Sequence, residues 1–168
     1  MSDATPSSES GAAGRTGARL LRNRRLMRAP IWLYRARLGF LLGSRLLLLE
    51  HTGRKTGARR YVVLEVIGHP HRDAYIVASG FGDRAQWYRN VVAQPRVRVA
   101  SGARGLSAAT ARRLSTVEAD AALAGYVRKH PRAWRRFKAV LENTLGTAVS
   151  ERDTALPMVE LRLDGAGT

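Results

Sequence analysis

The segment "EHTGRKTGARR" at positions 50–60 holds the clearest candidate for chemistry in this sequence. It brings four cations and two glycines into one short turn: Gly53, Arg54, Lys55, Gly57, Arg59 and Arg60. Like charges at this spacing repel one another, so the turn indicates a bound anion. Guanidinium groups suit phosphate or carboxylate oxygens, and glycines leave backbone N–H groups open to the same ligand.

A second segment, "SGFGDRAQWYRN" at positions 79–90, suits a flat ligand. Gly80 and Gly82 loosen the chain after an apolar run, and the aromatic pair Trp87 and Tyr88 follows. Loop glycines permit a close approach of the backbone to a ligand. An aromatic pair near a cationic turn favours a ligand with a flat ring at one end and anionic groups at the other.

Several other kinds of site are excluded by their missing motifs. The chain has no cysteine, and it contains no nucleophile elbow, no HExxH and no dinucleotide GxGxxG motif. "GRKTG" lacks the spacing of a P-loop and leads into a strand pattern. His69 and His71 share one turn with Asp73, but no further ligand set accompanies them, so we predict no metal site.

The charge balance predicts an anionic partner. Lysine and arginine number 29 against 13 acidic residues, a formal net charge of +16. Nucleic acid, anionic lipid and a phosphorylated or carboxylated small molecule all fit such a field, and so does a merely arginine-rich composition. No known nucleic-acid-binding motif is present, which disfavours the first partner.

The first part of the chain predicts a tail, an arm and a helix. Residues 1–18 are small, polar and without periodicity, which indicates disorder. Residues 19–29 form a basic arm, whose Arg19–Arg28 stretch could contact an anionic membrane or remain solvated. A helix is expected from Pro30 to about Gly43. Arginines interrupt its apolar run, so we expect no transmembrane span, and the absence of cysteine fits a cytoplasmic location.

The remainder predicts an α+β domain, and we expect 30–165 to form one unit. Period-two or apolar runs predict six strands, at 45–51, 61–67, 74–79, 96–100, 104–114 and 156–163. Three helices are expected between them: one capped by Asp83, one capped by Thr116, and one from Pro131 to about Leu145. The basic turn then joins the first two strands as a hairpin. Short connections between strands favour a mostly antiparallel sheet or barrel.

These residues resemble a known family. "LLLLEHTGRKTGARRYVVLEVI" and "YIVASGFGDRAQWYRNVVAQPRVRV" are similar to the deazaflavin-dependent nitroreductase and quinone reductase family, which uses coenzyme F420. The resemblance is strong over 31–100 and looser beyond. It implies a split β-barrel of the type found in flavin-binding pyridoxine phosphate oxidases. It also implies F420 as cofactor, with FMN as the alternative.

The resemblance also implies roles for individual residues of this sequence. It places the cofactor's phosphate and oligoglutamate tail on the basic turn, at Arg54, Lys55, Thr56, Gly57 and Arg60. It places the deazaflavin ring against the loop and the helix that follow the third strand, at Ser79, Gly80, Phe81, Gly82, Trp87, Tyr88 and Asn90.

The expected activity is hydride transfer from reduced F420 to a quinone-like or other conjugated small molecule. Two departures from the family leave the acceptor and the proton donor open. Gly80 replaces a lysine of well-studied members, and "KHPRAWRRF" lacks the tyrosines of nitroimidazole-reducing members. Tyr126 is the candidate proton donor. A basic nucleic-acid-binding or peripheral membrane-binding module without catalysis is the alternative, and the oligomeric state is left open.

Overall fold

The structure is a computed structural model that describes residues 45–165. The predicted tail at 1–18, the basic arm at 19–29 and the helix expected from Pro30 to about Gly43 lie outside these residues.

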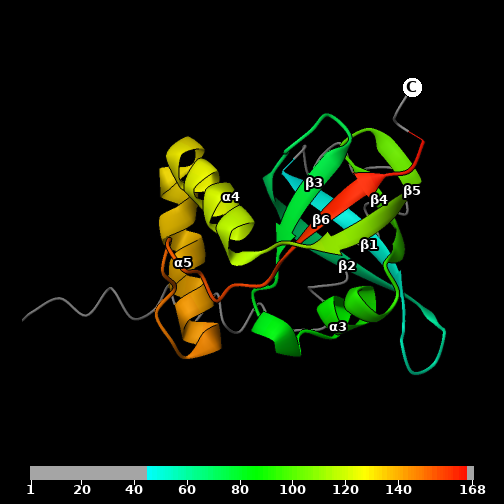
Figure 1. Cartoon of the computed structure of the whole chain (residues 1–168), viewed down its shortest axis with the longest axis horizontal. Coiled ribbons are helices and arrows are strands. Elements are labelled where there is room, and N and C mark those ends of the chain that lie inside the picture. Colours follow the sequence, from blue (N-terminus) through cyan, green and yellow to red (C-terminus); the bar gives the residue numbers. More distant parts are fainter. Residues whose placement is uncertain (1–44, 166–168) are drawn as a thin grey trace, which may run out of the picture.

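Six antiparallel strands close into a barrel in the order β1-β2-β3-β6-β5-β4 (Figure 1). Their bounds are β1 Leu46–Thr52, β2 Arg59–Gly68, β3 Ala74–Ala78, β4 Arg96–Ser101, β5 Arg104–Arg113 and β6 Met158–Leu163. The predicted α+β class and the barrel are therefore confirmed. The basic turn joins β1 to β2 as predicted, since Thr52 pairs with Arg59 across this hairpin.

The barrel interior is filled by alternate residues of each strand together with one short helix. Leu47 and Leu49 of β1, for example, point inward, whereas Leu48 belongs to a separate cluster on the outer face. The helix α3, Gln86–Ala93, follows a 3₁₀ turn, η3, at Gly82–Arg84. Its buried apolar side chains, Trp87, Tyr88 and Val91, join the interior cluster, so α3 is packed onto the barrel core.

Two longer helices cover one flank of the barrel (Figure 1). They are α4, Thr116–Lys129, and α5, Pro131–Leu145. Leu123 of α4 and Leu141 of α5 are almost fully buried against the outward-facing Ile76 and Met158. This second apolar cluster stabilises the helical pair on the outer wall, separately from the core inside the barrel.

Two predicted helix caps are wrong by position. Asp83 lies inside the 3₁₀ turn, and α3 begins after Ala85 without any side-chain cap. The cap of α4 is Ser115 rather than Thr116: the Ser115 hydroxyl accepts from the Glu118 backbone N–H, and the Glu118 carboxylate accepts from the Ser115 backbone N–H. Both Ser115 and Thr116 are good caps by type, and this reciprocal capping box selects the first.

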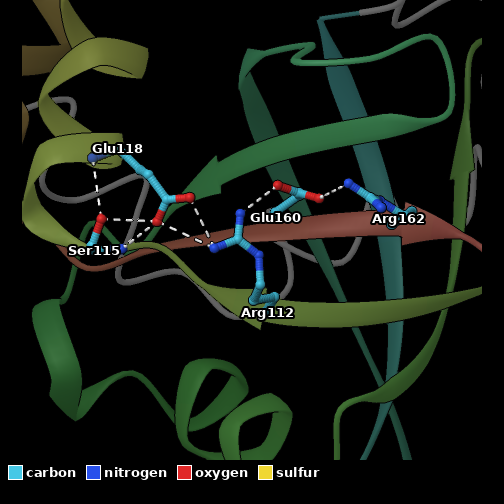
Figure 2. Close-up of polar contacts among 5 residues, drawn as sticks. All are labelled: Arg112, Ser115, Glu118, Glu160 and Arg162. Carbon is cyan, nitrogen blue, oxygen red and sulfur yellow. Dashed lines mark hydrogen bonds and ion pairs between the residues drawn. The ribbon is translucent and has the colours of Figure 1, made fainter.

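A polar network ties the first turn of α4 to the barrel wall (Figure 2). Arg112 of β5 donates to Glu160 of β6 at 2.7 Å and to Glu118 of α4 at 3.1 Å. Arg162 forms a second ion pair with the buried Glu160 at 3.2 Å. A buried carboxylate is stable only when it is paired. Arg112 pairs with Glu160 in the barrel wall and with Glu118 of α4, and so links the two.

We predict that Arg112→Met lowers the free energy of unfolding by about 1–2 kcal/mol, measured by urea denaturation. The expected loss is smaller than for a fully buried pair because about half of the Arg112 side chain is exposed and Arg162 still neutralises Glu160. Arg96→Met on β4 is the matched control, because Arg96 is exposed and forms no ion pair within residues 45–165. Equal losses of unfolding free energy in the two variants would contradict the role of Arg112 in linking α4 to the barrel wall.

The same network predicts a pH dependence. Hydrogen bonds from the Ser115 backbone and hydroxyl and from Arg112 lower the pKa of Glu118 below its usual value of 4.5. The capping contact is therefore fully present above pH 4.5 and is lost as the pH falls through the lower, folded-state pKa. Glu118→Gln keeps the capping geometry without the titrating proton. We expect the stability gap between wild type and Glu118→Gln to shrink on going from pH 7 to about pH 3. A gap that is the same at both pH values would refute this assignment.

Candidate functional site

The basic turn is folded tightly by its two glycines. The Gly53 backbone N–H donates to the Ala58 carbonyl, and the Gly57 N–H donates to the Gly53 carbonyl, each at 2.8 Å. A Cβ atom on Gly53 would lie 2.9 Å from Arg60 Nε, and Gly57 has φ of +67°. Neither position accommodates another residue without a shift or backbone strain. The sequence therefore fixes a compact turn with Arg60 folded across it.

The cations of the turn divide into one that is engaged and three that are free. The Arg54 guanidinium donates to Gln86 Oε1 at 3.1 Å and to Asn90 Oδ1 at 2.9 Å, both on α3. The other three cations are exposed and form no ion pair within the described part of the chain: Lys55, Arg59 and Arg60. Exposed cations that no carboxylate neutralises are what binding of an anionic ligand requires.

A buried polar pair lies beneath the turn. Asn90 and His51 are 3% and 5% exposed, and Asn90 Nδ2 lies 3.3 Å from His51 Nδ1. Burial, and then the positive charge of Arg60, lower the pKa of His51 to about 4. The imidazole is therefore neutral at physiological pH, and its Nδ1 can accept from the Asn90 amide.

The glycine-containing loop after β3 is closed by its own hydrogen bonds. Ser79 is fully buried: its backbone N–H donates to the Pro157 carbonyl at 2.8 Å, and its hydroxyl donates to the Gly82 carbonyl at 2.6 Å. A Cβ on Gly80 would lie 3.1 Å from Leu141 of α5. Phe81, in contrast, is half exposed. Phe81 is therefore the side chain of this loop that is most open to a ligand.

The aromatic pair of α3 belongs to the barrel core. Trp87 and Tyr88 are buried, and their rings meet edge to face with centroids 5.9 Å apart. Arg113 lies over the Tyr88 ring at 5.9 Å. Both rings thus hold α3 against the barrel, and little of either is left open to a ligand.

Tyr126 lies on the flank of the barrel, in a chain of polar contacts. Its hydroxyl donates to Glu65 Oε1 at 2.6 Å, and Arg45 donates to the same oxygen at 2.9 Å. Burial and the Glu65 carboxylate raise the pKa of Tyr126 to about 12. A phenol that holds its proton this firmly, on an acceptor of its own, is a poor proton donor near neutral pH.

A cavity of about 540 Å³ lies between α4 and the outer wall of the barrel. Its walls are mainly apolar and include Ile67, Ile76 and Leu114, with Arg112 and Lys129 among its polar lining. No residue of the basic turn, the glycine-containing loop or α3 lines it. Ile76 is three residues from Ser79, roughly 10 Å along a strand, so a small molecule confined to the cavity would not touch that loop.

The structure brings two of the predicted site residues into contact. Arg54 and Asn90 come together, although they are 36 positions apart. Thr56 contributes to the turn itself, because its hydroxyl accepts from the Ala58 N–H at 3.3 Å. Gln86 and His51 were not singled out from the sequence. The four-residue spacing of Gln86 and Asn90, which places both on one face of α3, was the available signal for Gln86.

Within residues 45–165, no helix is long and apolar enough to cross a membrane.

Comparison with solved structures finds chains of the same fold. The structure of an F420-H2 dependent reductase, FDR-A, is 25% identical with a TM-score of 0.50, over 70% of this chain and 94% of that chain. A structure described as a domain-swapped dimer is 22% identical with a TM-score of 0.52, over 88% of this chain and 98% of that one. Protein Atu2129 from Agrobacterium tumefaciens, of unknown function, is 19% identical with a TM-score of 0.50, over 82% of this chain and 56% of that one.

The comparison with curated proteins gives no match. A family model described as F420H(2)-dependent quinone reductase matches residues 26–152, which is most of the chain. This match includes the basic turn, the loop after β3 and α3. The chain belongs to the F420H2-dependent quinone reductase family and is therefore an F420-dependent oxidoreductase.

Proposed function

We propose that the protein transfers a hydride from reduced F420 to a quinone-like or other conjugated small-molecule acceptor. Family membership supports the cofactor and the reaction class. The observation that carries the placement of the cofactor is the set of free cations on the turn beside α3. F420 has an anionic phosphate and oligoglutamate tail, and these cations have the charge and the exposure to hold it.

Lys55 and Arg60 are the residues that would bind this tail, together with the hydroxyl of Thr56, and all three are exposed. The Gly57 backbone N–H, expected as a further donor, is already bonded to the Gly53 carbonyl at 2.8 Å, so Gly57 would shape the turn instead. Arg60 pairs with His51 across the hairpin, whereas Arg59 is on the opposite face of β2 because side chains alternate along a strand. Arg60 therefore shares the side of the hairpin on which the α3 contacts lie, and Arg59 points away from it.

The ring end of the cofactor would lie against the loop after β3, at Gly80, Phe81 and Gly82. Ser79 would shape this loop rather than contact the ring, because the serine is fully buried and bonded to the Gly82 carbonyl. When bound, reduced F420 supplies the hydride. The protein's task is to orient the ring at the loop and to exclude water from it.

Reduction of a carbonyl-type acceptor also needs one proton for each hydride. Tyr126 is poorly suited to give it, since its hydroxyl is bonded to Glu65 and its pKa is raised to about 12. The loop at 79–82 itself carries no titratable side chain. We therefore assign the proton to no side chain of this loop.

For the tail site we predict that Arg60→Ala and Lys55→Ala each weaken F420 binding by roughly 10- to 100-fold at low salt. This follows from a charge-assisted hydrogen bond worth about 1.5–3 kcal/mol. Fluorescence titration with F420 measures the affinity, and the losses should shrink at high salt because salt screens exposed charges.

The matched control for the tail site is Arg59→Ala, which removes the same charge from the other face of β2. Its loss of affinity should stay under about threefold, because only long-range attraction is removed. Equal losses at Arg59 and Arg60 would mean that the turn attracts anions without a defined site.

For the ring site we predict that Phe81→Ala weakens F420 binding by roughly 3- to 10-fold, since an aromatic contact is worth about 0.5–1.5 kcal/mol. Folding should be nearly unchanged because Phe81 is half exposed. Val92→Ala, at an exposed apolar residue of α3, is the control and should bind F420 like the wild type. An unchanged affinity in Phe81→Ala would place the ring away from this loop.

A further inference from the structure

We propose that Asn90 is a positioning residue for the cofactor: it acts through Arg54, whose side chain it holds against α3, and His51 fixes the direction in which the Asn90 amide points. This inference rests on the proposed F420 site at the basic turn. It gives Asn90 and Arg54 a different task from direct contact with the ring or the tail.

The direction of the Asn90 amide follows from its neighbours. Arg54 presents two donors to it, the backbone N–H at 3.2 Å and a guanidinium N–H at 2.9 Å. Only the amide oxygen can accept these bonds, so Oδ1 must face the turn and Nδ2 must face His51. The neutral His51 Nδ1, 3.3 Å away, is the acceptor that this arrangement needs. A reversed amide would place NH₂ against two donors of Arg54.

Burial prevents Asn90 from acting directly. The residue is 3% exposed, so a ligand on the protein surface cannot reach its amide. Arg54, which is partly exposed, connects this buried amide to the turn. Its guanidinium bridges Gln86 and Asn90, which are one helical turn apart on α3, and both bonds come from Nη1, so this nitrogen is directed at the helix.

Fixing Arg54 at both its backbone and its guanidinium fixes the start of the turn. The next residue, Lys55, and the returning strand at Arg60 are exposed and make no contact with α3 among the described hydrogen bonds and ion pairs. These free cations would otherwise repel one another and spread. The clamp of Arg54, Gln86 and Asn90 therefore pre-organises them for one anionic tail.

The deciding experiment compares two substitutions at Asn90 by fluorescence titration with F420 and by steady-state kinetics. Asn90→Leu keeps the volume but removes the acceptor, so affinity should fall by about tenfold as pre-organisation is lost. The KM for F420 should rise while kcat at saturation stays near the wild-type value. Asn90→Asp keeps an oxygen facing Arg54, and His51 can place its proton on Nδ1 to donate to the other oxygen. Its affinity should stay within about threefold of the wild type.

The same pair of variants can overturn the proposal. If Arg54 gripped the tail by its charge, Asn90→Asp would neutralise that charge and cost more than tenfold in affinity. An Asn90→Asp variant that binds as weakly as Asn90→Leu therefore refutes the positioning role. Wild-type affinity in Asn90→Leu would refute it too.

Gln86→Leu gives an answer even if Asn90→Leu does not fold, because Gln86 is exposed. The positioning role predicts a loss of about three- to tenfold when this acceptor is removed, whereas a directly bound Arg54 would be released and bind F420 equally well or better. Gln94→Leu, at the exposed C-terminal cap of α3, is the matched control and should bind like the wild type. Absence of F420 binding in the wild type itself would refute the proposed function instead.

Discussion

Closure of the barrel is the constraint on which the rest of the molecule depends. A closed antiparallel sheet has no free edge, and a slip of one residue would send every inward side chain outward. The core therefore determines the register of β1 and β2 up to the basic turn, where His51 pairs with Arg60 and Thr52 with Arg59. Strand alternation alone thus puts Arg60 on the face of the buried His51 and Arg59 on the other face. The opposite orientation of these neighbouring arginines is therefore a consequence of the strand register.

The short helix α3 connects that core to the turn. Trp87 and Val91, four residues apart, are buried in the barrel interior, while Gln86 and Asn90, also four apart, meet Arg54. One row of α3 side chains therefore packs into the core, and the adjacent row holds the basic turn. The turn is held by groups that apolar packing already fixes, so its geometry does not depend on exposed ion pairs, which contribute little to stability.

Much of this could be predicted from the sequence, because period-two runs and glycine turns are local signals. The features that the sequence did not show are either non-local or a choice between two residues that cap helices equally well. Trp87 and Tyr88 have the residue types of a ring pocket, but only the fold shows that they face the barrel interior. The contact between Arg54 and Asn90 spans 36 positions and leaves no local periodicity. The predicted cap, Thr116, is preceded by Ser115, which is an equally good cap by type, and the contact with Glu118 selects Ser115.

The flank of the barrel that α4 and α5 cover is held by different contacts from those of the basic turn. Polar ties hold α4 near both ends, Arg112 at its first turn and Glu65 at Tyr126, and the cavity of about 540 Å³ lies between helix and wall. The apolar cluster that contains Leu123, Ile76 and Met158 also holds α4 to the wall. Burial of Tyr126, and then its hydrogen bond to Glu65, raise the pKa of its hydroxyl, so the raised pKa is a by-product of its structural role. The turn and the loop after β3, in contrast, present exposed cations and the half-exposed Phe81 ring to solvent.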